Sequence, residues 1–314
     1  MNIVFMGTPD FAVPSLETLL DEGYNVVAVV TQPDRPQGRK KVLTPTPVKE
    51  AALAHGLPVL QPQRMRSPEA VQELAAYEPD LIVTAAYGQI LPKAVLDMPK
   101  YGCLNVHGSL LPKYRGGAPI QRSIINGEKE TGITLMYMAE GLDTGDMIAK
   151  SVVPIEDEDT SGTLFQKLSL AGAKLLKEQL PLVINGSAAR IPQNDEESTY
   201  AKNLSREDER INWADSSRDI YNRVRGLVPF AGGFTHWNGE VFKVWEVAKP
   251  ELTAASSGSG QAPGTVLAFH ANGIEVKTGD GSVILTKVQP AGKKAMEAAE
   301  FLRGGVLKKG EVFS

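Results

Sequence analysis

The sequence predicts a two-part α/β protein, in which an open, mainly parallel, Rossmann-like sheet is followed by a small OB-like β-barrel domain. Short apolar runs alternate with amphipathic stretches through the first half of the chain, which is the pattern of βαβ units. Beyond residue 207, short strand patterns follow one another with Asn-Gly and Asp-Gly pairs between them, as in antiparallel hairpins. The length of 314 residues is enough for two separate cores.

The elements of the first part follow from the spacing of apolar residues. Strands are expected at 3–6, 26–31, 59–60, 81–85, 103–107, 134–138 and 147–154. Helices are expected at 13–22, 47–55, 68–77 and 120–126, several with a proline near the first turn. The longest helical pattern covers 160–184 and has Gly186 just beyond its end.

The second part is predicted to be an antiparallel barrel. Its strands are expected at 232–236, 241–247, 264–269, 273–277 and 283–288. Residues 254–260 read Ala-Ala-Ser-Ser-Gly-Ser-Gly, which is typical of a mobile loop. We therefore expect a catalytic domain at 1–188, a polar linker at 189–206 and the OB-like domain at 207–314.

Composition excludes several classes of protein. The net charge of −4 gives no overall attraction to nucleic acid, so any such contact must come from local patches. The single cysteine, Cys103, is expected in the core and excludes an internal disulfide. No apolar run approaches the length of a membrane span, and the N-terminus reads as a strand rather than a signal peptide, so we expect a cytoplasmic protein. We also expect no metal, because no His, Asp and Glu side chains show ligand spacing.

The first strand is followed by Gly7-Thr8-Pro9, which bears on the choice of cofactor. A dinucleotide fold would have three glycines at this turn, so that the backbone can approach a pyrophosphate. Only one glycine is present here, and Pro9 removes a backbone donor. The sheet therefore resembles a Rossmann fold, but a role in binding NAD or a nucleoside triphosphate is not expected.

The catalytic candidates are Asn105, His107 and Asp143. Asn105 and His107 lie at the carboxyl end of an expected strand, where open α/β sheets bind ligands, and Asp143 follows in Gly-Leu-Asp-Thr-Gly. An amide and an imidazole can stabilise a carbonyl under attack, and a carboxylate within reach of the imidazole completes an acid–base pair. Taken singly, His107 could be a core histidine and Asp143 a turn former. Their combination with the motif at 109–119 favours catalysis.

Residues 105–121 read Asn-Val-His-Gly-Ser-Leu-Leu-Pro-Lys-Tyr-Arg-Gly-Gly-Ala-Pro-Ile-Gln. This motif closely resembles the signature of the 10-formyltetrahydrofolate-dependent formyltransferases, and the resemblance runs from residue 1 to the C-terminus. The segments at 5–9, 31–34 and 308–313 match the branch of that family whose acceptor is the methionine carried by initiator tRNA. The resemblance implies the formyltransferase fold and 10-formyltetrahydrofolate as the formyl donor.

The implied reaction moves the formyl group from reduced folate to the α-amino group of methionyl-initiator tRNA, for translation initiation. Direct attack by the amine gives a tetrahedral intermediate whose oxyanion needs aimed donors, which Asn105 and His107 can supply. Asp143 is the candidate to move the amine's proton and to keep His107 protonated or oriented. Direct attack requires no serine or cysteine nucleophile, and none is set up here, because Ser109 lacks an adjacent base in a nucleophile-elbow sequence.

Two segments resemble the family's folate pocket. Ser109, Leu110, Leu111 and Pro112 look like the segment that contacts folate, although the two leucines could equally be core residues. The residues that follow the strand at 81–85 are expected to form the opposite wall, in particular Tyr87, Gly88 and Ile90.

The loop from 32 to 44 is the candidate tRNA-binding segment. Four of its residues are basic, against the single acid Asp34: Arg35, Arg39, Lys40 and Lys41. Such a charge run is often no more than a solvated face. Its position after the second strand, and its resemblance to the family's loop that enters the tRNA acceptor stem, favour a basic arm that meets phosphates and bases.

One segment departs from the family pattern, because Phe230-Ala231 stands where the family has Trp-Pro, and we assign it no binding role. Three alternatives stay open. The acceptor could be an amino-sugar nucleotide or another small amine, the protein could be a formyltetrahydrofolate hydrolase, or it could bind RNA without catalysis. We expect a monomer whose partners are folate and charged initiator tRNA, with no membrane.

Overall fold

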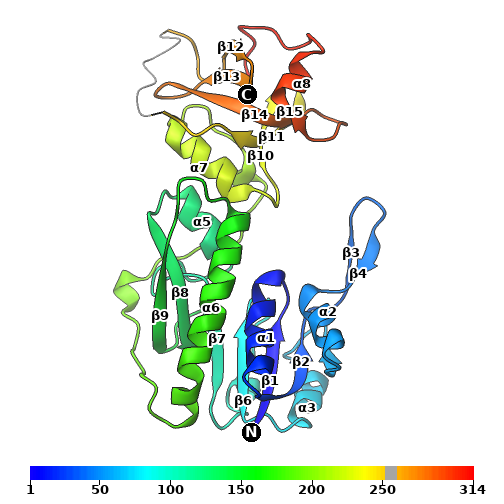
Figure 1. Ribbon diagram of the computed structural model, residues 1–314, viewed down its shortest axis with the longest axis vertical. Helices are drawn as coiled ribbons and strands as arrows, with labels where there is room; N and C mark the ends of the chain where they lie inside the picture. The colour runs from blue at the N-terminus through cyan, green and yellow to red at the C-terminus, as the bar shows by residue number, and fades with distance from the viewer. Residues whose placement is uncertain (252–259) are drawn as a thin grey trace. The chain divides into compact units, whose positions relative to one another are not determined.

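The computed structural model describes residues 1–251 and 260–314 (Figure 1). Of the loop predicted at 254–260, only Gly260 lies within the described residues. The chain forms two compact units that do not follow chain order. The first comprises Met1–Pro119, Glu130–Pro154 and Phe165–Ala201, and the second comprises Ile120–Lys129, Ile155–Leu164 and Lys202–Ser314. Residues 189–201, predicted as linker, thus belong to the first unit.

The first unit is built on a seven-stranded sheet with the order β5-β2-β1-β6-β7-β8-β9. Its strands are β1 (Asn2–Gly7), β2 (Asn25–Val30), β5 (Val59–Leu60), β6 (Leu81–Ala85), β7 (Cys103–His107), β8 (Glu130–Tyr137) and β9 (Met147–Pro154). The first five of these are parallel, whereas β8 and β9 are antiparallel. The strand order changes direction between β1 and β6, which defines a Rossmann-like topological switch point.

Helices cover both faces of this sheet (Figure 1). Val4 and Met6 of β1 share one core with Ala70 and Leu74 of α3. On the opposite face, an added Cβ at Gly172 of α6 would lie 2.8 Å from Val106, so this glycine lets the helix approach β7 closely. The helices of this unit are α1 (Val13–Asp21), α2 (Pro47–Ala54), α3 (Pro68–Ala75), α4 (Lys93–Leu96) and, from Phe165 onward, α6 (Ser161–Ile184), with the 3-10 turns η1 (Asp10–Ala12) and η2 (Asp195–Glu197). Helix α5 (Pro119–Ile125) belongs, apart from Pro119, to the second unit.

The second unit is an antiparallel sheet with the order β10-β11-β14-β13-β12, to which β15 adds beside β14. The strands are β10 (Gly233–Trp237), β11 (Glu240–Val247), β12 (Val266–His270), β13 (Gly273–Lys277), β14 (Ser282–Gln289) and β15 (Met296–Glu297). The 3-10 turn η3 (Glu207–Glu209) and the helices α7 (Ser217–Leu227) and α8 (Ala298–Leu302) complete it. The five predicted strands are confirmed.

The C-terminal tail closes this sheet. His236 of β10 exchanges backbone hydrogen bonds of 2.8 and 3.0 Å with Ser314, while Val266 of β12 accepts and donates similar bonds with Gly310 and Glu311. The tail thus joins the two edge strands and gives the OB-like barrel that the sequence predicts. Phe313 anchors it, because its ring is almost fully buried and stacks on Trp213 and Phe242 at centroid distances of 6.0 and 5.1 Å.

The segment 32–44 differs from the predicted irregular loop. It forms a two-stranded hairpin of β3 (Arg35–Gln37) and β4 (Val42–Thr44), in which Pro36 faces Leu43. Its root is fixed where Asp34 pairs with Lys49 at 3.0 Å and accepts a 2.7 Å hydrogen bond from Gln61. These hydrogen bonds lower the pKa of the Asp34 carboxyl, so the anchor stays ionised at neutral pH.

Candidate active site

Three parallel strands end at one edge of the first sheet, and side chains join their ends. After β1, the Thr8 hydroxyl donates to the carbonyl of Tyr87 at 2.8 Å, which ties it to the end of β6. After β2, Gln32 Nε2 donates to the carbonyl of Gly88 at 3.0 Å. The carboxyl ends of the strands beside the switch point are therefore one connected surface, where a ligand is expected to bind.

Asn105 lies on β7 with its amide oriented by the neighbouring strand. The Thr84 hydroxyl of β6 donates to Asn105 Oδ1 at 2.8 Å. This contact leaves the two Nδ2 hydrogens of Asn105 for another acceptor. Because successive side chains of a strand alternate between faces, Asn105 and His107 lie on the same face of the sheet. The half-buried amide is thus a candidate oxyanion donor.

Thr84→Val should lower kcat about fivefold with little change in either KM. The substitution keeps the shape of the side chain but removes a hydrogen bond that contributes about 1 kcal/mol and fixes the direction of the Asn105 amide. Steady-state kinetics beside Thr84→Ser, which keeps the hydroxyl, measure the effect. Equal rates for the two variants would contradict an orienting role for this contact.

His107 and Asp143 lie together as predicted. His107 is buried, and its Nδ1 lies 3.8 Å from Asp143 Oδ2. Its Nε2 lies 2.9 Å from the carbonyl oxygen of Tyr114. Because a carbonyl oxygen only accepts, Nε2 carries a hydrogen, and Nδ1 is the nitrogen that can exchange a proton with the carboxylate. The role of His107 as an oxyanion donor stays a prediction. In this arrangement its Nε2 hydrogen is donated to the carbonyl oxygen of Tyr114 and not to a ligand.

The loop between β8 and β9 brings Asp143 to this place in a constrained conformation. Asp143 has a φ of +52°, a left-handed backbone that aspartate tolerates better than most residues. Gly145 is required, because an added Cβ would lie 1.7 Å from the carbonyl oxygen of Tyr137. The backbone N–H of Gly116 donates to Asp143 Oδ2 at 2.8 Å and fixes the carboxylate. The side chain is therefore held on a rigid turn.

The predicted folate segment forms a fixed turn against β8. The Ser109 hydroxyl donates to the carbonyl of Lys113 at 2.6 Å, and its own carbonyl accepts from Thr134 at 2.7 Å. Leu111 is fully buried among Met136 and Met147, and the Leu111–Pro112 peptide is cis. The side chains of Ser109 and Leu111 are thus turned inward, and the half-buried Leu110 and Pro112 are the ones a ligand could meet.

The predicted opposite wall follows β6. Tyr87 is buried, with no hydrogen-bond partner for its hydroxyl among the described residues, and burial raises the pKa of this phenol to about 12. Gly88 has a φ of +93°, and an added Cβ would lie 2.9 Å from Gln32 Nε2. Ile90 is 79% exposed. The Tyr87 side chain therefore belongs to the core, and Ile90 is the exposed apolar side chain of this wall.

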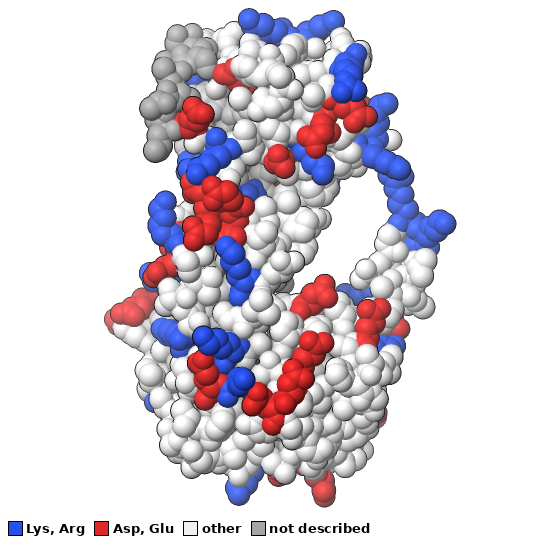
Figure 2. Space-filling model, viewed as in Figure 1, with Lys and Arg blue, Asp and Glu red and all other residues white. Residues whose placement is uncertain are grey.

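The four predicted basic residues all lie on the β3–β4 hairpin. Arg35 belongs to β3, while Arg39, Lys40 and Lys41 lie in the turn. All four are exposed, and Figure 2 shows Lys and Arg gathered at the tip of the hairpin. Lys41 has a φ of +48° and Gly38 a φ of +73°, as a tight turn requires. The hairpin presents its cations to solvent together with the exposed Val42 and Leu43.

Three groups that hydrogen-bond to the catalytic candidates were not predicted from the sequence. Thr84, the carbonyl of Tyr114 and the N–H of Gly116 each contact a catalytic candidate directly. Arg115 and Gly116 lie inside the quoted motif, so their nearness to the site could have been anticipated. Thr84 sits within a buried strand, and no sequence signal distinguishes it from a core residue.

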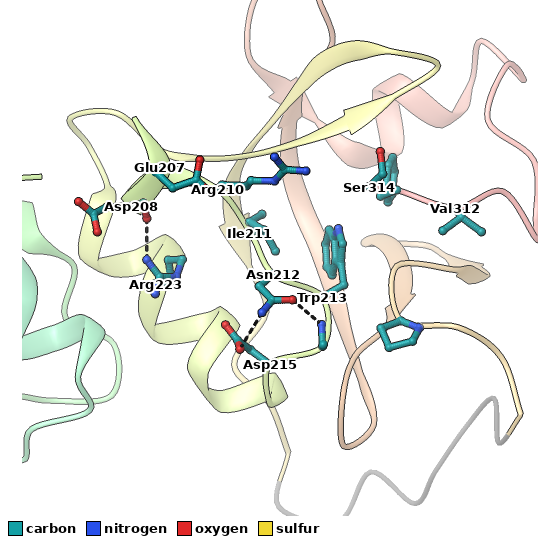
Figure 3. A pocket seen from close by; sticks show the side chains of 13 residues that line it. Glu207, Asp208, Arg210, Ile211, Asn212, Trp213, Asp215, Arg223, Val312 and Ser314 are labelled. Atoms are coloured by element: carbon teal, nitrogen blue, oxygen red, sulfur yellow. Dashed lines mark hydrogen bonds between the residues drawn. The ribbon is translucent and has the colours of Figure 1, made fainter. Parts of the chain in front are cut away.

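A separate pocket of about 770 Å³ opens in the second unit, around Trp213 and the C-terminal tail (Figure 3). Several of its polar groups are paired with one another: Arg223 donates to the carbonyl of Asp208 at 2.6 Å, and Asn212 Nδ2 donates to Asp215 at 3.3 Å. We assign it no part in the chemistry.

Within residues 1–251 and 260–314, no group of three or more His, Cys, Asp or Glu side chains is arranged to hold a metal ion. Over the same residues, no helix is both long and apolar enough to span a membrane.

Two family models match the chain. One described as "Formyl transferase" matches residues 1–180, and one described as "Formyl transferase, C-terminal domain" matches residues 203–305. The chain therefore belongs to the formyl transferase family, which confirms the resemblance seen in the motif at 105–121.

Two of the similar proteins are methionyl-tRNA formyltransferases. A methionyl-tRNA formyltransferase from Geobacillus thermodenitrificans is 57% identical over 304 residues, covering 96% of this chain and 94% of that protein. One from Bacillus subtilis is 55% identical over 312 residues, covering 99% of this chain and 97% of that protein. The crystal structure of an N-formyltransferase from Helicobacter canadensis with folinic acid and dTDP-3-aminofucose aligns at a TM-score of 0.67 and 22% identity, over 90% of this chain and 98% of that one. That structure confirms the fold.

Proposed function

We propose that this protein transfers the formyl group of 10-formyltetrahydrofolate to the α-amino group of methionyl-initiator tRNA. The observation that carries the proposal is the arrangement of Asn105, His107 and Asp143 at the carboxyl edge of the sheet, with His107 Nδ1 3.8 Å from Asp143 Oδ2. Identities of 55% and 57% over nearly the whole chain to methionyl-tRNA formyltransferases support this acceptor.

Each of the three side chains has its own role when an amine attacks the formamide. Asn105, with its Oδ1 held by Thr84, directs Nδ2 hydrogens toward the formyl oxygen as negative charge develops. Asp143 accepts the proton that the attacking amine must lose, and His107 Nδ1 faces the same carboxylate and can return a proton to the leaving nitrogen.

The residues around the site fit a reduced folate. Ile90 and Leu142 are 79% and 60% exposed, and with the half-buried Leu110 they offer apolar contact to an aromatic ring system. Backbone groups at the ends of β6 and β7 can bond polar ring edges. We therefore retain Leu110, Pro112 and Ile90 as side-chain contacts to folate, and Ser109, Leu111, Tyr87 and Gly88 as positions that can contact it through their backbone groups.

The β3–β4 hairpin supplies the reason to prefer tRNA as acceptor. Both of its strands are exposed, and its four basic side chains lie on the surface. They can therefore contact the phosphates of a nucleic acid without any change in the protein core. Arg35 and Arg39 can also fork to a base or stack on it, which lysine cannot do. A small amine or water as acceptor gives no physical reason for such an exposed basic hairpin.

Replacing Arg39 and Lys40 together with alanine should raise the KM for charged tRNA about 10- to 100-fold while leaving the KM for folate unchanged. The reason is that two contacts to nucleic acid are lost far from the reacting atoms. Kinetics of formyl transfer at fixed salt measure it. The matched control is Lys100→Ala with Lys174→Ala, which removes two exposed lysines elsewhere on the unit. An unchanged KM would reduce the hairpin to a solvated turn.

We further propose that the protein acts as a cytoplasmic monomer and that the second unit helps to hold tRNA. The cations Lys308, Lys309 and Arg303 of the C-terminal region are available for that purpose, since each is largely or partly exposed. The alternative acceptor is an amino-sugar nucleotide, as in the Helicobacter canadensis structure. That protein is only 22% identical to this chain, which supports a shared fold but not a shared acceptor.

A further inference from the structure

Residues 191–201, which are part of the segment 189–206 predicted as linker, lie against both loops that carry the site. Ile191 pairs with Met147 of β9 through backbone hydrogen bonds of 2.8 and 2.9 Å. Arg115 donates its backbone N–H to Thr199 and accepts from Ala201. An added Cβ at Gly116 would lie 2.7 Å from the carbonyl oxygen of Ala201, so the segment packs directly on the turn that binds Asp143.

Gln193 is the side chain through which this segment reaches Asp143. Its Nε2 donates to the carbonyl oxygens of Asp143 and Gly145, both at 2.8 Å. Its Oε1 accepts from Arg115, at 3.1 Å from Nε and 2.9 Å from Nη2. Every hydrogen-bonding group of the amide is therefore used, and its orientation is fixed by having a cation on one side and two carbonyls on the other.

Arg115 connects the amide to the rest of the site. It is 2% exposed, and its second partner is Asp195 at 2.8 Å. Along the chain it stands between Tyr114, whose carbonyl accepts from His107, and Gly116, whose N–H binds the Asp143 carboxylate. A single network thus runs from the segment 191–201 to both members of the acid–base pair.

We propose that Gln193 is a positioning residue for Asp143, and that the segment 191–201 is part of the catalytic scaffold and not a simple linker. The Asp143 turn is left-handed at φ +52°, and the two Gln193 bonds hold its carbonyls in the orientation that this conformation requires. The inference rests on the proposed function, because the role of Asp143 does.

The effect should be large for a residue that does not touch substrate. Asp143 Oδ2 already lies 3.8 Å from His107 Nδ1, so proton transfer depends on small movements of this carboxylate. A shift of about 1 Å in a reacting group can cost on the order of 100-fold in rate. Binding of folate and tRNA depends on other surfaces and is expected to be unaffected.

The test is Gln193→Glu, which keeps an oxygen for Arg115 but turns a carboxylate oxygen toward the carbonyls of Asp143 and Gly145. We expect kcat to fall about 10- to 100-fold with both KM values within about twofold of wild type. Gln193→Leu, which removes all four contacts, should behave similarly. Ser187→Ala is the matched control outside the segment: its exposed hydroxyl bonds Asn185 and contacts no part of the network, so the variant should keep wild-type kcat. Circular dichroism melting confirms that each variant is folded.

A double-mutant cycle separates positioning from general destabilisation. If Gln193 acts through Asp143, Gln193→Glu should lower kcat by less than about twofold in an Asp143→Asn background. Wild-type kcat in Gln193→Glu, or the same fold loss in both backgrounds, would overturn the inference. Failure of the proposed function looks different, because then the wild-type protein itself would show no formyl transfer.

Discussion

Asp143→Asn should lower kcat about 10³-fold while the protein stays folded. The amide can still accept from the Gly116 N–H through its oxygen, so the turn keeps the 2.8 Å contact that fixes the side chain. What is lost is the base, and positioned acid–base groups contribute about 10²- to 10⁴-fold to rate. His107→Ala should cause a loss of similar size. Among the described site residues, the imidazole is the group placed to take up a proton from the Asp143 carboxyl.

The measurement is single-turnover formyl transfer with saturating folate and charged tRNA, which reports the chemical step apart from product release. Because the two residues act as a pair, the double variant Asp143→Asn with His107→Ala should lose little more than either single variant. Glu140→Gln, on the exposed part of the same loop, is the control and should keep full activity. Near-normal turnover in either single variant would remove that residue from the mechanism.

Phe313→Ala should lower the free energy of unfolding of the second unit by about 3–5 kcal/mol, the cost typical of truncating a buried phenylalanine. The ring is 1% exposed and packs between Trp213 and Phe242, so its loss leaves a cavity that the rigid aromatic neighbours cannot fill. It also frees the tail that closes the barrel between β10 and β12.

Urea unfolding followed by tryptophan fluorescence measures this effect, since Trp213 contacts the deleted ring. Val312→Ala is the matched control: it truncates the adjacent residue, which is 51% exposed, and should change stability by less than about 0.5 kcal/mol. Similar losses in both variants would mean that the tail is held by its backbone alone and that the Phe313 ring adds nothing.

The strands of both units could be predicted because each buries at least one face. Runs such as 81–85, buried at every position, are visible in the sequence as continuous apolar stretches. The β3–β4 hairpin could not be predicted in this way, because its strands are exposed and Pro36 interrupts one of them. Helix α7 was also missed, although Ser216 caps it and Ile220, Val224 and Leu227 recur at helical spacing, so the sequence did carry a signal for this helix.

The candidate site also has a part that could be predicted from the sequence and a part that could not. Asn105, His107 and Asp143 could be proposed because their side chains carry the chemistry, and chemistry limits the residue types. The closing of the barrel by Ser314 on His236, and the bonds from Gln193 to Asp143, join residues that are 78 and 50 positions apart. Several of these contacts use backbone groups, which every residue has, so no pattern in the sequence marks them.

The most direct test of the proposed function is an assay of purified protein with 10-formyltetrahydrofolate and charged initiator methionyl-tRNA, in which formyl-methionine on the tRNA is measured. We expect rapid transfer to charged tRNA, none to uncharged tRNA, and none to an amino-sugar nucleotide offered at the same concentration. Turnover of the folate without formylation of tRNA would contradict the assigned acceptor and would favour a small amine or water in its place.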